Sequence, residues 1–197
     1  MNKLPVGILL AAGQSRRFGS NKLLYPVIDN TPMLMVTAKK LVSVLSETIC
    51  VINQEMTPYT NELELLGMQV IINEHAHCGI GSSISCSIAA SQAASGWLIT
   101  LADMPYIEIN TIEILANKIK DGAEIVAPVY EHQRGHPVGF NQRFKDELMA
   151  LNDDVGARHV IAKNINRFGL IPTRDKGVIT DIDYKSSNRN ADNILSQ

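Results

Sequence analysis

One loop of the sequence gathers small and cationic residues of the types that bind phosphates. The stretch AAGQSRRFGSNK, residues 11–22, follows an apolar run. Its small residues let backbone amides approach a ligand closely, and Arg16, Arg17 and Lys22 concentrate positive charge. Neither the Walker spacing nor the G-x-G-x-x-G fingerprint is present. The pattern predicts a polyphosphate loop of another kind, with a solvated surface loop as the alternative.

Acidic residues follow two other apolar runs. Asp103 ends the run WLITLAD, and Asp181 and Asp183 end GVITDID, which we expect to be a strand that places both aspartates on one face. Magnesium is bound by one or two carboxylates together with phosphate oxygens and water. We therefore expect Asp103, with Asp181 or Asp183, to hold Mg²⁺. The alternative for Asp103 is a turn or helix-capping role before Pro105.

A third segment, NEHAHCGIGSS, is predicted to open a helix at its glycines and serines. Free amides and hydroxyls at a helix start favour an anion or a base edge, so Gly81, Ser82 and Ser83 are candidate nucleotide-binding residues. An ordinary N-cap is the alternative. His75, His77 and Cys78 do not indicate zinc, because no second pair of ligands with matching spacing appears.

Two further motifs place a histidine and an arginine close to glycines. QRGHPVGF contains His136, held by Pro137, and DDVGAR contains Arg158, which lies five residues after Asp153 and four after Asp154. A histidine of this kind is usually a structural group, and Arg158 can equally be an exposed residue at a helix start.

These candidates need a sheet that brings loops together. Six runs of five to seven apolar residues are typical of strands covered on both faces, and segments of helical periodicity separate them. The sequence therefore predicts an α/β fold with three layers and a mostly parallel, Rossmann-like sheet. Helices are expected around residues 34–45 and 112–119, the second with a capping box formed by Asn110 and Glu113. Ligands of such sheets collect at the carboxyl ends of the strands.

Composition sets the broad class. The chain has 197 residues, 45% hydrophobic and 19% charged, with a formal charge of -2. We expect one domain over residues 1–197 and neither nucleic-acid nor membrane partners, which call for a basic face. Three cysteines at irregular spacing predict a cytoplasmic protein without a disulfide framework, in which Cys78 and Cys86 are at least partly buried.

Motifs along most of the chain resemble one enzyme family. LLAAGQSRRFGSNKLL matches the L-A-A-G-x-S-x-R-x-G-x-x-K signature of nucleotidyltransferases similar to molybdenum cofactor cytidylyltransferase, with Arg17 at the signature arginine and Arg16 as an extra cation. LADMP, GIGSS, RGHPVGF and DDVGAR are also similar to family segments, Asp154 being the aligned acid of the last. The family usually reads D-I-D-T-P, whereas Tyr184 and Lys185 replace Thr-Pro here.

The resemblance implies the fold of the nucleotide-diphospho-sugar transferases and a role for each motif. Arg17, Lys22 and Asp103 would be catalytic, and Asp103, Asp181 and Asp183 would bind Mg²⁺. The implied acceptor site contains His136, Pro137 and Arg158, in which His136 would bind the substrate phosphate or a molybdenum oxo ligand and Arg158 would help to hold the phosphate. The implied nucleotide site consists of Leu10, Ala11, Ala12, Gly13, Arg16, Arg17, Lys22, Gly81, Ser82 and Ser83. In the family, alanine at position 12 accompanies cytidine rather than guanine nucleotides.

The resulting hypothesis is transfer of CMP from CTP to the molybdenum-bearing molybdopterin cofactor, with release of pyrophosphate and possible delivery of the product to a molybdenum hydroxylase. Three alternatives are open. The chain can use another nucleotide or acceptor, it can be a non-catalytic carrier of the cofactor, or it can reduce a pigment or another small molecule. The last is the weakest, because the sequence carries no nicotinamide fingerprint.

Overall fold

The computed structural model describes residues 3–13 and 21–182. Within these ranges eight strands form one sheet in the order β10-β7-β9-β6-β1-β4-β5, with β8 paired to β7. The strands of this sheet are β1 (Val6–Ala11), β4 (Thr48–Ile52), β5 (Gln69–Ile72), β6 (Gly96–Leu101), β7 (Ile125–Tyr130), β8 (Gln133–Arg134), β9 (Val138–Asn141) and β10 (Phe168–Pro172). A separate hairpin consists of β2 (Pro26–Ile28) and β3 (Thr31–Pro32).

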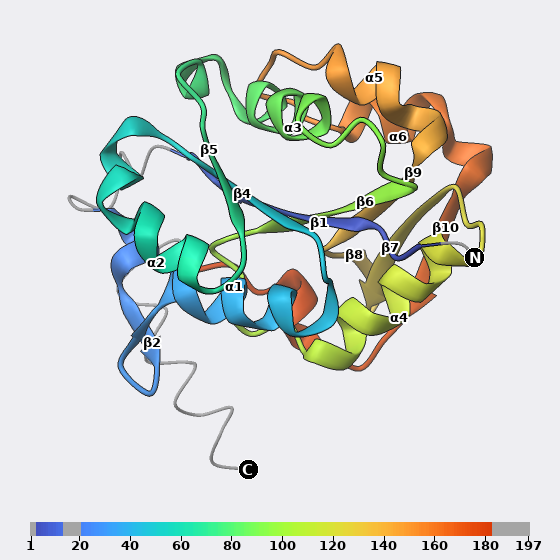
Figure 1. Ribbon diagram of the computed structural model, residues 1–197. Coiled ribbons are helices and arrows are strands. Elements are labelled where there is room, and N and C mark those ends of the chain that lie inside the picture. The colour runs from blue at the N-terminus through green and yellow to red at the C-terminus, as the bar shows by residue number, and fades with distance from the viewer. Residues whose placement is uncertain (1–2, 14–20, 183–197) are drawn as a thin grey trace.

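Helices cover both faces of the sheet (Figure 1). In the view of Figure 1, α3, α5 and α6 lie above it, and α1, α2 and α4 lie below. The helices are α1 (Met33–Val44), α2 (Thr60–Leu65), α3 (Ile80–Ala89), α4 (Ile109–Lys120), α5 (Lys145–Met149) and α6 (Arg158–Lys163). Short 3-10 helices include η1 (Lys22–Leu24), η3 (Ala76–Cys78) and η6 (Lys176–Ile179). The three predicted layers are therefore present.

The central strand β1 shows why this arrangement is stable. All six of its residues are buried, and successive side chains point to opposite faces of the sheet. Leu9 and Ala11 pack in the core under α1 and α4, whereas Ile8 and Leu10 pack in the core with α3 and α5. Burial on both faces stabilises the strand at about 25 cal/mol per Å² of apolar surface.

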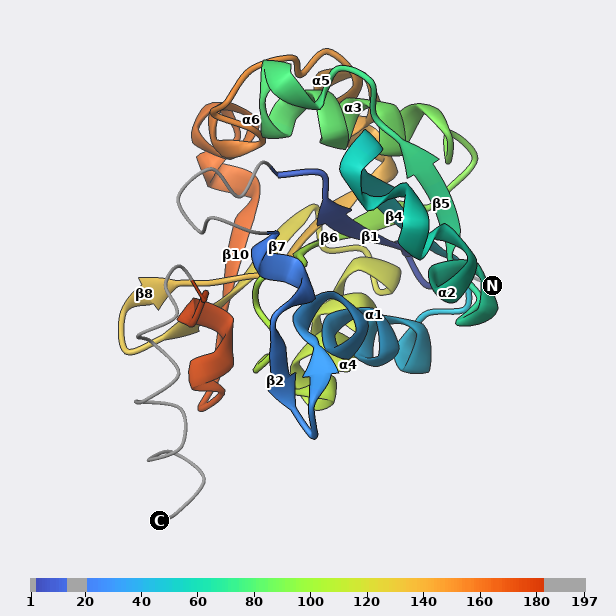
Figure 2. The ribbon, with the colours of Figure 1, turned by 90° about the vertical axis from the view of Figure 1, so that its left-hand side faces the viewer.

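The sheet is mostly parallel, as predicted. β1 pairs in parallel with both β4 and β6, and β10 pairs in parallel with β7. β9 lies between β6 and β7 and is antiparallel to both, so one strand in the middle of the sheet runs opposite to its neighbours. Figure 2 turns the left-hand side of Figure 1 toward the viewer and shows the end of the sheet where β1 stops.

The predicted strand at residues 177–183 is wrong. The Asp175 side chain accepts a hydrogen bond from the backbone N–H of Gly177, which starts η6 instead. The alternation argument for Asp181 and Asp183 therefore fails, and Asp183 lies outside the described residues. β10 and the β2–β3 hairpin, which are short edge or surface strands, are not among the predicted strands.

Two smaller expectations also need correction. α4 begins at Ile109, so Asn110 lies inside the helix rather than capping it, and the N-cap residue is Glu108. Cys78 is exposed rather than buried, whereas Cys86 is partly buried as predicted. The described part of the chain contains no helix that is both long enough and apolar enough to span a membrane.

Candidate active site

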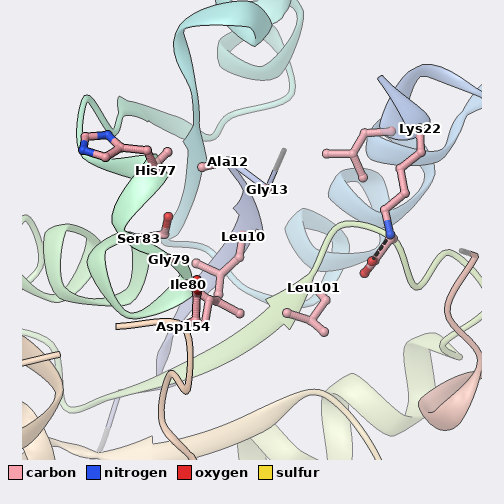
Figure 3. Close-up of a pocket in the computed structure, with 13 residues that line it drawn as sticks. Leu10, Ala12, Gly13, Lys22, His77, Gly79, Ile80, Ser83, Leu101 and Asp154 are labelled. Atoms are coloured by element: carbon pink, nitrogen blue, oxygen red, sulfur yellow. Dashed lines mark hydrogen bonds and ion pairs between the residues drawn. The ribbon is translucent and has the colours of Figure 1, made fainter. Parts of the chain in front are cut away.

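A cavity of about 450 Å³ opens at the carboxyl ends of β1 and β6. Parallel strands end together at this edge, so the loops that follow them converge there. Figure 3 shows its walls, with Lys22 on one side and His77 and Ser83 on the other. The lining residues are Leu10, Ala12, Gly13, Lys22, Leu23, Ala76, His77, Gly79, Ile80, Ser83, Leu101, Asp103 and Asp154.

Lys22 and Asp103 meet in this cavity. The Lys22 Nζ lies 2.7 Å from the Asp103 Oδ2, and each side chain is 20% exposed (Figure 3). Lys22 begins η1, whose N-cap Asn21 accepts a hydrogen bond from the backbone N–H of Leu23. Asn21 thereby fixes the start of η1. The cavity thus contains a paired cation and anion, the two kinds of group needed for a phosphate and a metal ion.

The loop that carries Asp103 is held from α1. The Thr37 hydroxyl donates to the carbonyl of Ala102, and the Lys40 Nζ donates to the carbonyls of Pro105 and Ile107 at 2.7 and 2.9 Å. Burial lowers the pKa of Lys40, although the negative charges of Asp175 and Glu108 oppose the shift. Asp103 therefore projects from a loop whose backbone is fixed on both sides.

The segment after η6 also reaches Asp103. The backbone N–H of Ile182 donates to the Asp103 carbonyl at 3.1 Å. Asp181, the preceding residue, is exposed and makes interactions of its own. Because Asp181 directly precedes Ile182, it lies next to the Asp103 loop, although the predicted strand is absent.

The opposite wall is formed where α3 begins. Gly79 has a φ of +109°, and a Cβ there would overlap the Asp154 backbone and carboxylate. The Gly81 N–H donates to the Asp153 carbonyl at 2.8 Å, which joins the two predicted motifs. This close approach places Asp154 in the cavity wall beside the start of α3.

Asn73 contacts both predicted serines, and its Nδ2 donates a hydrogen bond to the Ser82 hydroxyl oxygen at 2.9 Å. The Ser83 side chain is buried and its oxygen accepts a hydrogen bond from the Asn73 Nδ2 at 3.0 Å, while Ser83 also lines the cavity. The Ser82 hydroxyl donates to the Gly79 carbonyl within its own helical turn. Asn73, which follows β5, therefore positions both serines, of which Ser83 lines the cavity.

His136 lies on the turn between β8 and β9. Its backbone N–H donates to the Val178 carbonyl at 2.9 Å, and its ring Nδ1 is buried with no hydrogen-bond partner among the described residues. Burial, together with the nearby positive charges of Arg134 and Arg158, lowers the pKa of His136 to about 4, although the negative charge of Asp103 opposes the shift. The ring is therefore neutral at pH 7.

The charges that act on His136 show how the second half of the site is assembled. Arg158 is exposed at the first position of α6, and Arg134 is exposed on β8, with its guanidinium 5.9 Å from the centre of the Phe168 ring. Both arginines and Asp103 act on His136, so the motifs RGHP and DDVGAR converge toward the Asp103 side of the sheet.

The structure groups the predicted residues as follows. Leu10, Ala12, Gly13, Lys22, Ser83 and Asp103 line the cavity. Ala11 is buried in β1, Pro137 is buried beside His136, and Gly81 and Ser82 begin α3 behind the wall. His136 and Arg158 lie outside the cavity lining, and Arg16, Arg17 and Asp183 lie outside the described residues.

Several residues that support the site were not identified from the sequence. These residues are Lys40, Asn73 and Asp175. Each donates or accepts a hydrogen bond with a group ten or more residues away in the sequence, and no local sequence pattern predicts such contacts. Arg134 belongs to the motif RGHP, but the predicted roles in that motif fall on His136 and Pro137. His77 was considered only as a zinc ligand, and no group of three potential metal-binding side chains occurs within residues 3–13 and 21–182.

Comparisons with known proteins agree with this geometry. Residues 7–168 match the family described as the MobA-like NTP transferase domain. The chain is 25% identical to nicotine blue oxidoreductase of Paenarthrobacter nicotinovorans, over 90% of this chain and 91% of that protein. It is 26% identical to the purine catabolism protein PucB of Bacillus subtilis, with the same shares covered. A probable molybdenum cofactor guanylyltransferase of Thermococcus sibiricus is 27% identical, over 61% of this chain and 59% of that protein.

Solved structures share the fold. The crystal structure of Rv0371c from Mycobacterium tuberculosis superposes with a TM-score of 0.83 at 23% identity, over 96% of this chain and 97% of that one. A nucleotidyl transferase from Methanothermobacter gives a TM-score of 0.81 at 17% identity, with 98% of each chain covered. The predicted fold of the nucleotide-diphospho-sugar transferase type is confirmed.

Proposed function

The chain belongs to the family of MobA-like NTP transferase domains, and from this premise we propose that it transfers CMP from CTP to the molybdenum-bearing molybdopterin cofactor. Molybdenum cofactor nucleotidyltransferases are among its relatives. CTP as the nucleotide, Mg²⁺ as the metal and the identity of the acceptor are the proposed parts. Ala12 in the cavity wall, at the position that accompanies cytidine nucleotides in the resembling enzymes, supports CTP.

One observation carries the proposal, namely the 2.7 Å pair of Lys22 and Asp103 in a cavity at the carboxyl ends of parallel strands. A triphosphate needs a cation, and a metal ion that accompanies it needs a carboxylate. Gly13 and the start of α3 leave room for phosphate oxygens and for a base on the wall opposite Lys22. The site therefore has a place for each part of a nucleotide.

The carboxylates of this site suit magnesium. Mg²⁺ keeps several waters and is typically bound by one or two carboxylates together with substrate phosphates, so a cage of protein ligands is not required. Asp103 would hold it, with Asp181 or Asp183 as the second carboxylate. When bound, the ion would offset the negative charge that develops as pyrophosphate leaves.

The reaction requires little acid or base chemistry from the protein. An oxygen of the acceptor's terminal phosphate attacks the α-phosphorus of CTP, and the bond from that phosphorus to the bridging oxygen of the β-phosphate breaks. The electron pair leaves on pyrophosphate. Lys22, released from Asp103, would hold the triphosphate and stabilise the developing charge, so the protein acts by positioning and electrostatics.

The acceptor would be held on the side of β8, β9 and α6. His136 and Arg158, with Arg134 in addition, offer a neutral ring and two guanidinium groups for a phosphate or an oxo ligand. Because the ring of His136 is neutral at pH 7, it would bind as a hydrogen-bonding group rather than as a cation. We place the reaction in the cytoplasm and propose a molybdenum hydroxylase as the recipient of the product.

Pyrophosphate release tests the proposal. We expect release with CTP, Mg²⁺ and molybdopterin cofactor together, much less with GTP, ATP or UTP, and loss of release in Asp103→Asn. Asp121→Asn is a matched control, because Asp121 is exposed at the far end of α4. Release with GTP alone would favour guanylyl transfer, and cofactor binding without release from any nucleotide would favour a carrier.

One relative is named an oxidoreductase, so the experiment needs a redox arm. Oxidation of NADH or NADPH by candidate dyes, followed by absorbance at constant protein concentration, tests that alternative. We expect no oxidation that depends on Lys22 or Asp103.

A further inference from the structure

Asp175 is a buried carboxylate that lies outside the cavity lining and yet holds several parts of the site. It is 3% exposed. Its Oδ2 accepts hydrogen bonds from the Glu108 N–H at 2.8 Å and from the Thr111 hydroxyl at 2.7 Å, and its Oδ1 accepts one from the Gly177 N–H at 2.8 Å. A buried carboxylate is tolerated when its oxygens are bonded in this way.

These hydrogen bonds join two segments that are far apart in the sequence. Glu108 and Thr111 belong to the start of α4, directly after the loop that carries Asp103. Gly177 lies in η6. The two segments pack so tightly that a Cβ on Gly177 would overlap the carbonyl of Tyr106. Asp175 therefore fixes η6 against the Asp103 loop.

η6 then contacts the other side of the site. The carbonyl of Val178 accepts the hydrogen bond from the backbone N–H of His136 at 2.9 Å. Shortly after η6 ends, the Ile182 N–H donates to the Asp103 carbonyl at 3.1 Å. The same short helix thus touches the loop with the proposed metal ligand and the turn with the proposed acceptor ligand. Figure 2 shows η6, in red, beside β8.

We propose that Asp175 is a positioning residue that keeps Asp103 and His136 in register by anchoring η6 between their loops. The proposal rests on the proposed function for the roles of those two side chains. Lys40 holds the same loop from α1, because its ammonium donates hydrogen bonds to the Pro105 and Ile107 carbonyls. The negative charge of Asp175 also acts on Lys40 and raises its pKa, against the effect of burial. Asp175 lies outside the cavity lining and would act through the backbone of the two segments that it joins.

An isosteric variant separates this role from general stability. In Asp175→Asn an NH₂ group replaces one of the accepting oxygens, so at least one of the bonds to Gly177 and Glu108 is lost. Thr111→Val removes only the hydroxyl bond and keeps both backbone bonds. Leu63→Ala is the matched control for stability, because Leu63 is buried in α2, beside the edge strand β5.

The first readout is the pKa of the His136 ring, followed by NMR of the five histidines with His136→Gln for assignment. If η6 moves, the ring gains solvent, and its pKa rises from about 4 toward 6.5. We expect a rise of about one unit or more in Asp175→Asn, and no change in Leu63→Ala at equal loss of melting temperature. This readout needs no enzymatic activity.

The second readout is the affinity for Mn²⁺ as a probe of the metal site, measured by electron paramagnetic resonance with CTP present. We expect about tenfold weaker binding in Asp175→Asn and wild-type binding in Thr111→Val. If Asp175→Asn does not fold, Gly177→Ala replaces it, since the added Cβ presses η6 away from Tyr106.

The outcomes are separable. An unchanged His136 pKa and unchanged Mn²⁺ affinity in Asp175→Asn, or equal changes in Leu63→Ala, would overturn the positioning role. Absence of pyrophosphate release from the wild type would instead overturn the proposed function, and a shifted His136 pKa would still support Asp175 as the anchor of η6.

Discussion

Both ends of the central sheet are hollowed, but they differ in the side chains that they bring together. At the amino ends a hollow of about 610 Å³ is lined in part by the mostly small residues from Ala89 to Ser95, and its charged lining residues are Lys3 and Glu47. At the carboxyl ends the smaller cavity of about 450 Å³ contains the Lys22–Asp103 pair and Asp154. Size therefore does not identify the site. Convergent charge does, because loops that follow parallel strands meet at one edge.

The largest effect is expected from Asp103→Asn, which removes the charge of the proposed metal ligand and keeps its shape. We expect pyrophosphate release from CTP to fall about 10³-fold or more, since charge stabilisation is the main contribution of such a site. Steady-state kinetics at saturating Mg²⁺ and a thermal melt measure this. Activity within tenfold of the wild type would contradict the assignment of Asp103.

Lys22→Met tests the role of the cation that is paired with Asp103 in the cavity. We expect the KM for CTP to rise about 10- to 100-fold, because a charge-assisted contact to phosphate is lost. Without nucleotide, Mn²⁺ should bind more tightly than to the wild type, because the ammonium no longer competes for Asp103. Lys39→Met, an exposed neighbour on α1, is the control and should change neither value.

His136 is expected to affect stability at low pH. The pKa of its ring is about 4 in the folded protein and about 6.5 when unfolded, so the unfolded chain binds more protons between these values. Stability should thus be fully present above pH 6.5 and fall by about 3 kcal/mol as pH drops toward 4. Urea unfolding of wild type and His136→Gln measures it, and the same pH slope in both would count against a buried neutral ring.

The smallest effect on activity and stability is expected from substitutions at the amino ends of the sheet strands. Glu47→Gln and Lys3→Gln change charges beside the larger hollow, and we expect activity within about twofold and stability within about 0.5 kcal/mol of the wild type. Kinetics and thermal melts on both variants suffice. A tenfold loss of activity in either would remove the contrast between the two ends of the sheet.

Much of the fold could be predicted from the sequence, because the pattern that identifies each of its central strands lies within a few consecutive residues. β1, β4, β6 and β7 are continuous apolar runs, and burial on both faces requires that pattern. Residues 177–183 were mistaken for a strand because Asp175, which precedes the run, caps a 3-10 helix through its own side chain. A capping contact of this kind overrides the preference of Val178 and Ile179 for extended structure.

The candidate site was predictable to the extent that its motifs are contiguous. Lys22, Asp103 and Ser83 line one cavity, and their distances in sequence gave no indication of the 2.7 Å contact between the first two. The anchors Lys40 and Asp175 were missed because they bind backbone groups 65 to 67 residues away. Such contacts exist only once the layers have packed.

The central claim is that the Lys22–Asp103 cavity performs nucleotidyl transfer to a phosphate acceptor. Phosphorus-31 NMR of one sample containing protein, CTP, Mg²⁺ and molybdopterin cofactor tests it most directly. The account predicts equal amounts of free pyrophosphate and a new phosphodiester of the α-phosphorus for the wild type, and neither for Asp103→Asn. Intact CTP with the wild type, or product formation undiminished in Asp103→Asn, would contradict it.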